Sequence, residues 1–423
     1  MPVNPIVIDT TIQAYAEPTV TYGNILIIGR ESGGSASDDE VKQCDSLNDV
    51  ATYFGSTTDI YYAAVQAFNQ GIARVWGIRV SQTAVAVEST PGAALHVLDN
   101  FPVSATPAPA IAGYTFEYTF GVPTDPGALK AMLNPLTGQI YINSAGPHNV
   151  AYSYTDWTAI EAIIAEEAID IVCLAGAEGD AQWYGEVDSV LDICDTNKWI
   201  LPMKSDPAAD AADIVTDFGN YSSRNMLAVA CKALGSNEDL NGALAGLIAQ
   251  IEPWDKLMWK RINDITVSAY FTTSEVESTL EAGNVNAIIL KQAAPRLSDG
   301  LTMAGGDYKY MDTTRTQYWL EEQIIDDLSL LMQNSRVPFT QTGIDIVQDT
   351  IEGTCDLAVA NGALRSPWVD NTGQGRIGYT VQVPDFSDVA DADRLDRILK
   401  NVYVTVWFAG HIQSITLNLA IQL

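Results

Sequence analysis

The sequence predicts an α/β protein with an open, largely parallel sheet covered by helices, which changes to an α+β arrangement in its C-terminal third. Two observations predict this class. Short apolar runs alternate with amphipathic segments of helical length over most of the chain, and the last third places two long helical segments before a set of strands. With 423 residues and a hydrophobic fraction of 47%, the chain can bury sizeable cores.

The first part of the α/β core occupies residues 21–80, after an extended N-terminal arm of residues 1–20. An apolar run ending in glycine predicts a buried strand, and two helical segments and a second apolar run follow it. These elements are expected at Tyr22–Gly29, 39–55 (one or two short helices), 56–71 and Ile72–Val80. Such a β–α–β unit makes the two strands parallel, with a right-handed crossover.

Residues 81–150 have a different character. Proline, alanine, serine and glycine become frequent in "FPVSATPAPAIAGYTF", and short alternating runs such as "QIYIN" predict small antiparallel strands. We expect an inserted β-rich subdomain that faces the surface.

Residues 151–290 continue the α/β core. Helical segments again alternate with short apolar strands, and a capped helix that ends at Gly283 leads into a final strand. The helices are expected at 155–168, 183–197, 208–219, 239–251 and 272–283, and the strands at 169–176, 198–204, 225–232 and 284–290.

Residues 291–400 are expected to form a C-terminal domain with two long helices. The first covers 313–335 and has a continuous apolar stripe, and the second covers 344–362 and ends at Asn361-Gly362. The stripe consists of Leu320, Ile324, Ile325, Leu328, Leu331 and Met332. Strands are predicted after these helices, at 376–384 and 401–410.

Both ends of the chain are typical of strands without a local hairpin partner. Residues 401–423 contain no Asp, Glu, Lys or Arg and finish in strict alternation, and residues 1–20 include the apolar run Ile6, Val7, Ile8. The alternating apolar positions at the C-terminal end are Ile415, Leu417, Leu419, Ile421 and Leu423. From the residues alone, the C-terminal strand could instead close its own domain's sheet, and the N-terminal arm could be a disordered tail.

The charge balance is strongly acidic. The chain has 22 Lys and Arg against 53 Asp and Glu, a formal net charge of −31, and it has no basic run. This composition argues against nucleic-acid partners and anionic membrane surfaces, which both favour clustered basic residues. It favours adaptation to high salt over a merely acidic cytosolic protein.

No constellation typical of catalysis or cofactor binding is found. Gly29, Gly33 and Gly34 follow an apolar strand, but their spacing fits neither GxxxxGK[ST] nor GxGxxG, and the carboxylates of residues 38–40 would repel a phosphate. The three histidines have no metal-ligand spacing, and the five scattered cysteines are typical of buried, reduced thiols. We therefore expect no enzyme activity, cofactor or metal site.

Four stretches of the sequence resemble contractile tail sheath proteins of bacteriophages, archaeal viruses and contractile injection systems. They cover residues 49–80, 274–290, 300–364 and 388–423. The middle of the chain matches that family in the order of its elements and not in motifs. The acidic balance is a departure from the family, and it bears on where the virus or its host lives.

The resemblance implies a structural subunit. Sheath subunits polymerise as six-membered rings stacked around a tail tube, and contraction of the stack drives the tube into the host envelope. It implies a homo-oligomer in a virion tail, assembled in the host cytoplasm with tail tube, baseplate and tail terminator proteins, without nucleic acid or membrane insertion. It also implies that Ile6–Ile8 and the alternating C-terminal residues pair with strands of neighbouring copies.

Two other functions remain open at this point. One is another tail component, such as a tube or baseplate protein, which usually lacks the long two-helix segment before the final strands. The other is a cytoplasmic nucleotide-using α/β enzyme, which the absence of a phosphate, metal or nucleophile motif disfavours.

Overall fold

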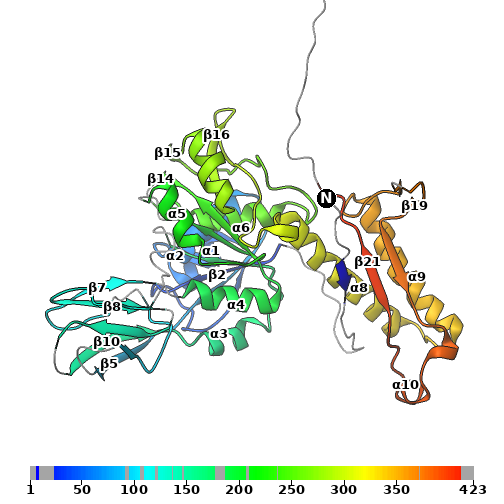
Figure 1. Cartoon of the computed structure of the whole chain (residues 1–423), viewed down its shortest axis with the longest axis horizontal. Coiled ribbons are helices and arrows are strands. Elements are labelled where there is room, and N and C mark those ends of the chain that lie inside the picture. The colour runs from blue at the N-terminus through cyan, green and yellow to red at the C-terminus, as the bar shows by residue number, and fades with distance from the viewer. Residues whose placement is uncertain are drawn as a thin grey trace, which may run out of the picture. The chain divides into compact units, whose positions relative to one another are not determined.

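A computed structural model describes residues 23–90, 95–104, 109–119, 122–135, 137–144, 147–176, 186–205, 209–235, 237–370 and 372–410, together with the backbone of Ile6–Ile8 (Figure 1). The chain forms two compact units. The α/β unit contains Gly23–Ile251 and Leu257–Met311, and the C-terminal unit contains the rest, including Glu252–Lys256 and everything from Asp312 onward. Residues 291–311 thus lie in the α/β unit.

The α/β unit is built on two four-stranded sheets that an Ile171–Ile200 bridge joins edge to edge. The strand orders are β11-β2-β4-β3 and β12-β13-β16-β17, parallel except for the antiparallel outer strands β3 and β17. The strands are β2 (Ile25–Gly29), β3 (Lys42–Cys44), β4 (Val75–Arg79), β11 (Ile171–Leu174), β12 (Leu201–Lys204), β13 (Met226–Ala230), β16 (Asn286–Lys291) and β17 (Ala294–Leu297). The predicted open, largely parallel sheet is confirmed.

Helices cover both faces of this sheet. Helices α3 and α4 lie on one side of it and α6 on the other (Figure 1). Because successive residues of a strand point to opposite faces, Leu26 and Ile28 join the core under α3, α4 and α5. The helices are α1 (Leu47–Phe54), α2 (Asp59–Asn69), α3 (Trp157–Ile164), α4 (Val187–Asn197), α5 (Ala211–Phe218), α6 (Leu240–Gln250) and α7 (Thr273–Glu275). Helix α7 continues as a π turn (Val276–Leu280) and a 3-10 turn (Glu281–Gly283).

One expectation in the α/β unit is wrong. Residues 39–55 were expected to form one or two short helices, but Lys42–Cys44 forms β3 and only Leu47–Phe54 forms a helix, which ends at Gly55. The three residues of β3 are too few for a periodic signal. Their conformation is decided by pairing with β4.

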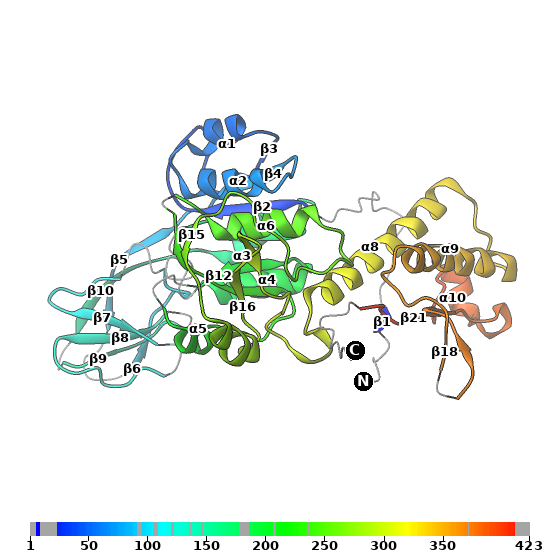
Figure 2. The ribbon, with the colours of Figure 1, turned by 90° about the horizontal axis from the view of Figure 1, so that it is seen from above.

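The inserted subdomain has its own apolar core, which includes Leu133, Ile140 and Val150. Its strands are β5 (Thr83–Thr90), β6 (Leu95–Val97), β7 (Thr115–Tyr118), β8 (Lys130–Asn134), β9 (Gln139–Ile142) and β10 (His148–Tyr154). Strands β5 and β10 pair, and the other four form a sheet in the order β6-β9-β8-β7 (Figure 2). The predicted antiparallel pairing holds except between β7 and β8, which are parallel.

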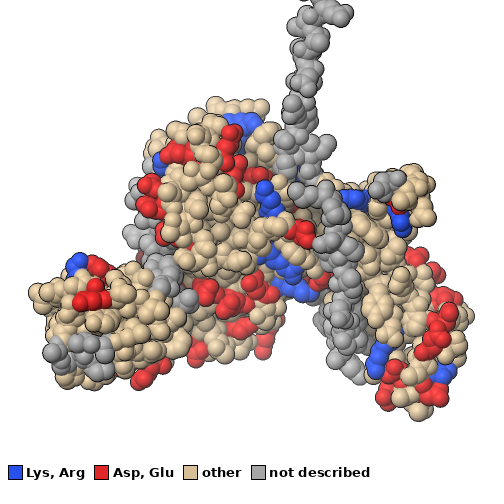
Figure 3. Space-filling view, in the orientation of Figure 1, with Lys and Arg blue, Asp and Glu red and all other residues tan. Residues whose placement is uncertain are grey.

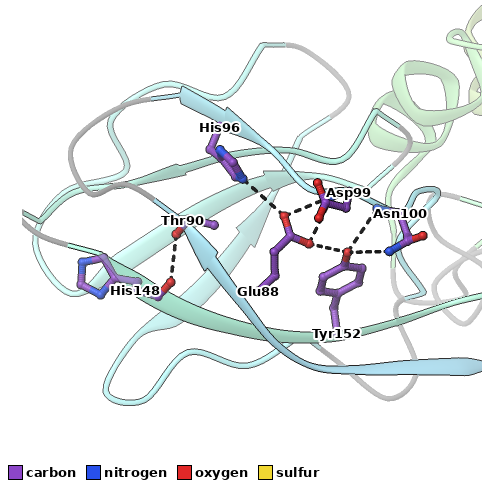
Figure 4. A network of polar contacts seen from close by, with 7 residues as sticks. All are labelled: Glu88, Thr90, His96, Asp99, Asn100, His148 and Tyr152. Atoms are coloured by element: carbon purple, nitrogen blue, oxygen red, sulfur yellow. Dashed lines mark hydrogen bonds and ion pairs between the residues drawn. The ribbon is translucent and has the colours of Figure 1, made fainter.

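A polar network centred on Glu88 joins the two sheets of this subdomain (Figure 4). The Glu88 carboxylate on β5 accepts a hydrogen bond from the Tyr152 hydroxyl on β10 at 2.6 Å and from the Asp99 backbone N–H at 3.1 Å. The His96 ring on β6 lies 3.3 Å from the same carboxylate. Burial and this hydrogen bond to Glu88 raise the pKa of Tyr152 to about 12. The network therefore holds three strands from both sheets in one arrangement.

The C-terminal unit packs two helices against a small sheet (Figure 2). Its other elements are short strands and one short helix, α10. The elements are α8 (Met311–Asn334), which begins at the last residue of the α/β unit, α9 (Gln341–Ala360), β18 (Trp368–Val369), β19 (Gly375–Arg376), β20 (Tyr379–Gln382), α10 (Asp391–Asp396), β21 (Tyr403–Val406) and β1 (Ile6–Ile8). In the α/β unit, β14 (Lys232–Leu234) and β15 (Val267–Ala269) form a further antiparallel pair.

The strand expected at 376–384 is divided. Residues Gly375–Arg376 pair with β18, whereas Tyr379–Gln382 pair with β21. The division falls at Gly378, where a Cβ atom would lie 2.2 Å from the Arg365 carbonyl oxygen. The close approach of two backbones therefore ends one pairing and starts the next.

The predicted burial of the cysteines is confirmed. All five cysteines are buried free thiols. Within the described part of the chain, no helix combines the length and the apolar character that crossing a membrane requires.

Candidate assembly surface

Strand β21 is the centre of the three-stranded sheet of the C-terminal unit, in the order β1-β21-β20. Alternation along β21 buries Val404 and Val406 against α8 and α9 and leaves Tyr403 exposed. Both of its long sides are paired, on one side with β20 and on the other with β1.

The pairing of β1 with β21 joins segments about four hundred residues apart in the sequence. Ile6 lies opposite Val406, Val7 opposite Thr405, and Ile8 opposite Val404, in antiparallel register. Without β1, this side of β21 would be an open edge of unpaired N–H and C=O groups. The sheet of the C-terminal unit is therefore completed by the N-terminal strand.

Polar contacts hold the sheet on its helices. The Tyr379 hydroxyl on β20 donates to Asp356 on α9 at 2.6 Å, and the Thr354 hydroxyl on α9 donates to Asp327 on α8 at 2.6 Å. Burial and the hydrogen bond to Asp356 raise the pKa of Tyr379 well above its ordinary value. Strand β21, which pairs with both β1 and β20, therefore belongs to a sheet that is hydrogen-bonded to α9, and α9 is hydrogen-bonded to α8.

The structure describes only part of the predicted set of arm residues. Ile6, Val7 and Ile8 form β1 on their own chain's β21, so they are in a strand. Ile415, Leu417, Leu419, Ile421 and Leu423 lie outside the described residues. Pairing of either arm with a neighbouring copy stays a prediction. Sequence reasoning missed β21 as the acceptor, although its run "YVTV" without charge is typical of a central strand.

The place where open α/β sheets usually bind ligands is occupied by the protein's own side chains. Connections leave β2 and β11 in opposite directions, which makes the gap between their carboxyl ends the topological switch point. There Arg30, directly after β2, forms an ion pair with Glu186, which precedes α4, and both side chains are almost fully buried. The Ser104 hydroxyl donates to Glu186 at 3.0 Å. Burial lowers the pKa of Arg30 to about 9, so it remains charged at neutral pH.

A second buried polar group at the same edge of the sheet is also used internally. The Asp239 carboxylate caps α6 by accepting the Gly242 N–H at 3.0 Å, and it accepts the Gly176 N–H at 2.7 Å. Burial raises the pKa of Asp239. Asn241 accepts from the Lys204 N–H at 2.8 Å. These contacts satisfy the backbone at the strand ends, a structural task.

The described residues include no group of three or more His, Cys, Asp or Glu side chains placed to hold a metal ion.

One family model matches the C-terminal part of the chain by sequence. Residues 311–421 match the family model described as "E217 tail sheath protein gp31-like, C-terminal domain". A comparison with curated protein sequences finds no match.

Solved structures match the whole fold. The contracted helical sheath of the anti-feeding prophage matches with a TM-score of 0.61 at 12% identity, covering 98% of each chain. The contracted PVC sheath complex of an extracellular contractile injection system matches with a TM-score of 0.63 at 10% identity, covering 98% of this chain and 97% of that one. The sheath tail protein of Desulfitobacterium hafniense matches with a TM-score of 0.54 at 13% identity, covering 98% and 100%. The chain therefore has the fold of contractile tail sheath proteins.

Proposed function

We propose that this chain is the structural subunit of a contractile tail sheath, a non-enzymatic protein that polymerises around a tail tube and shortens to drive that tube into the host envelope. The observation that carries the proposal is the likeness in fold to contracted sheath subunits over 98% of the chain. The match of residues 311–421 to a sheath family model supports it independently by sequence.

The arms supply a physical means of linking copies. Ile6–Ile8 pair with β21 through the backbone, so the same ladder in the same register can form with β21 of a neighbouring copy. Such an exchange replaces one contact by an identical one and has a low energetic cost. The residues 411–423, with their alternating apolar positions, are proposed to add to the sheet of another copy. Main-chain pairing does not depend on side-chain charge, so copies of charge −31 can still be linked.

We extend the proposal to the arrangement of the copies, their partners and their environment. Copies are arranged as six-membered rings stacked helically in a virion tail, after assembly in the host cytoplasm. Their partners are the tail tube, baseplate and tail terminator proteins, and contraction leads to genome ejection. The acidic balance supports an environment of high salt.

A cysteine pair tests whether the strand crosses between copies. Val7 and Thr405 lie directly opposite each other in the ladder, and opposite residues of antiparallel strands have Cα atoms about 4.5–5.5 Å apart, within the range of disulfides. The native thiols are buried, so Val7→Cys/Thr405→Cys adds the reactive pair. We expect oxidised assemblies to give covalent ladders of many subunits on denaturing gels.

The matched controls are the two single-cysteine variants, which should run as monomers or dimers. Negative-stain microscopy of the same samples should show tubes or rings. A sample with tubes but only internally cross-linked monomers would contradict strand exchange. A monodisperse monomer, unchanged in size by deletion of residues 411–423, would contradict the sheath function itself.

A further inference from the structure

The hairpin between β16 and β17 has an unusual backbone. Its two turn residues, Gln292 and Ala293, both have positive φ values of 53° and 57°. Two-residue hairpin turns of this kind normally use Asn or Gly, because other side chains are strained there. Trp259, in the segment that pairs along the outer side of β17, has a φ of 61° as well. Three non-glycine residues thus hold a left-handed conformation within one small surface region.

Arg296 on β17 holds this region together. Its guanidinium donates to the Trp259 carbonyl oxygen at 2.8 Å, to the Lys291 carbonyl oxygen at 3.2 Å and to the Gln292 side chain at 3.1 Å. The Lys291 ammonium lies over the Trp259 ring. A clamp that joins the hairpin to the neighbouring segment keeps the strained conformations in place.

The clamped hairpin presents an aromatic side chain together with cations. The side chain of Trp259 is 42% exposed, and the Lys291 ammonium lies over its ring. Arg261, whose backbone bridges to Arg296 on β17, is exposed, and Lys291 is partly exposed. Trp and Arg dominate the binding energy of protein interfaces. In a chain of net charge −31, this basic region is opposite in charge to the chain as a whole.

Helix α4 carries the matching charge. Asp188, Asp192 and Asp195 follow one another at i, i+4 and i+7, along one face of the helix. Burial and the neighbouring carboxylates raise the pKa of Asp188 and of Asp195. Asp195 accepts a hydrogen bond from the Ser223 hydroxyl at 2.5 Å and interacts with the charge of Arg224. Among the described residues, Asp188 and Asp192 form no ion pair within 4.0 Å. Acidic side chains gather over α4 in the space-filling view (Figure 3).

We propose that the clamped hairpin of one copy docks on the acidic face of α4 of a second copy of this chain. The inference rests on the proposed polymer of copies and adds a second contact, independent of the strand arms. Because the two surfaces differ, the contact is heterologous, and such contacts produce rings or open helices, as a stacked sheath requires. A cation from the hairpin relieves the repulsion within the α4 face, which gives the pairing its specificity.

Cross-linking tests the contact in the full chain. Ala293→Cys places a thiol at the tip of the hairpin, and Thr196→Cys places one on the acidic face of α4, since position 196 is i+8 from Asp188 and both sites are exposed. A flexible bis-maleimide should give dimers and higher ladders in the double variant. Each single-cysteine variant should give neither.

Charge reversal shows whether the contact is specific. In the double-cysteine background, Lys291→Glu should lower the cross-linked fraction by about tenfold, and adding Asp192→Lys should restore most of it. Lys130→Glu makes the same change of charge on strand β8 of the inserted subdomain, and it should leave the fraction unchanged. A fraction no greater than in the single-cysteine variants, or one unaffected by Lys291→Glu, overturns the inference.

The cross-linked fraction and the formation of tubes are measured independently, the first on denaturing gels and the second by microscopy. Tubes without this cross-link reject the inference and leave the sheath function standing. A charge-dependent cross-link without tubes supports the contact and counts against the sheath function.

Discussion

At the scale of the residue, Arg30 and Glu186 place two opposite charges in an almost fully buried site of the α/β unit. An intact buried ion pair contributes little net stability, since desolvation offsets the attraction. Loss of one partner leaves an uncompensated charge in a medium of low polarity. Ser104, from the inserted subdomain, adds a hydrogen bond to Glu186. The pair therefore holds the end of β2, the start of α4 and the inserted subdomain together, and its side chains occupy the switch point.

We expect Glu186→Ala to lower the free energy of unfolding by about 3–5 kcal/mol, because Arg30 is then buried without its counter-charge. Urea denaturation followed by circular dichroism measures the change. The double variant Arg30→Met/Glu186→Leu is the control and should be close to the parent chain. A double variant as unstable as the single one would show that packing, not the unpaired charge, causes the loss.

The thiols predict how stability responds to alkaline pH. Burial raises the pKa of Cys44, Cys231 and Cys355 from 9.0 to about 12. The folded chain keeps these protons where the unfolded chain loses them. The free energy of unfolding should therefore fall as the pH rises above 9, through the window up to about 12. Urea midpoints at pH 8 and pH 10 test this, and Cys355→Ala should reduce the slope. A midpoint independent of pH would contradict the burial argument.

At the scale of the element, helix α9 shows that tertiary contacts decide whether a glycine position tolerates a side chain. Thr340 caps the helix by accepting the Gly343 N–H. A Cβ atom at Gly343 would lie 1.8 Å from the Pro338 carbonyl oxygen, whereas a Cβ atom at Gly353 would meet nothing within 4 Å. The two glycines of one helix thus have opposite requirements.

Gly343→Ala should destabilise the C-terminal unit by about 1–3 kcal/mol, because the turn before α9 must move. Gly353→Ala should stabilise the same helix by about 0.5–1 kcal/mol, since alanine loses less backbone entropy than glycine. Hydrogen exchange of peptides from α9 reports both changes in the intact chain. Equal effects of the two substitutions would mean that the close approach at Gly343 does not constrain the turn.

The short strands mark the limit of sequence reasoning at this scale. The runs of β2, β4, β11 and β13 are predicted because each buries a continuous apolar segment. Strand β3 is not predicted, because three residues carry no period and its partner β4 lies more than thirty residues away. The same holds for the acceptor of β1, which is decided by a pairing across almost the whole chain.

At the scale of the whole molecule, the net charge of −31 dominates. A polymer brings many such charges together, and the screening length falls from about 10 Å at 0.1 M salt to about 3 Å at 1 M. Contacts between opposite charges, such as the proposed hairpin and α4 pair, also weaken with salt, but they involve few groups. The net effect of salt on assembly is therefore expected to be favourable.

Assembly should strengthen as salt is raised from 0.1 M to about 1 M, because repulsion between copies is screened. The pelleted fraction and the length of filaments by microscopy measure the effect. A chain in which several exposed Asp residues are changed to Asn should assemble at lower salt. Filaments that keep their length after dilution into low salt would contradict this prediction.

The sequence by itself determined the class of fold, the order of the main elements and the acidic surface, because periodicity and composition are local properties that each segment carries along the chain. It also showed that no familiar catalytic motif is present. The tertiary structure alone decided the ion pair at the switch point, the acceptor of the N-terminal strand and the clamped hairpin. Arg30 and Glu186, Ile6 and Val406, and Trp259 and Arg296 each meet only after folding. No local pattern records a contact between residues so far apart.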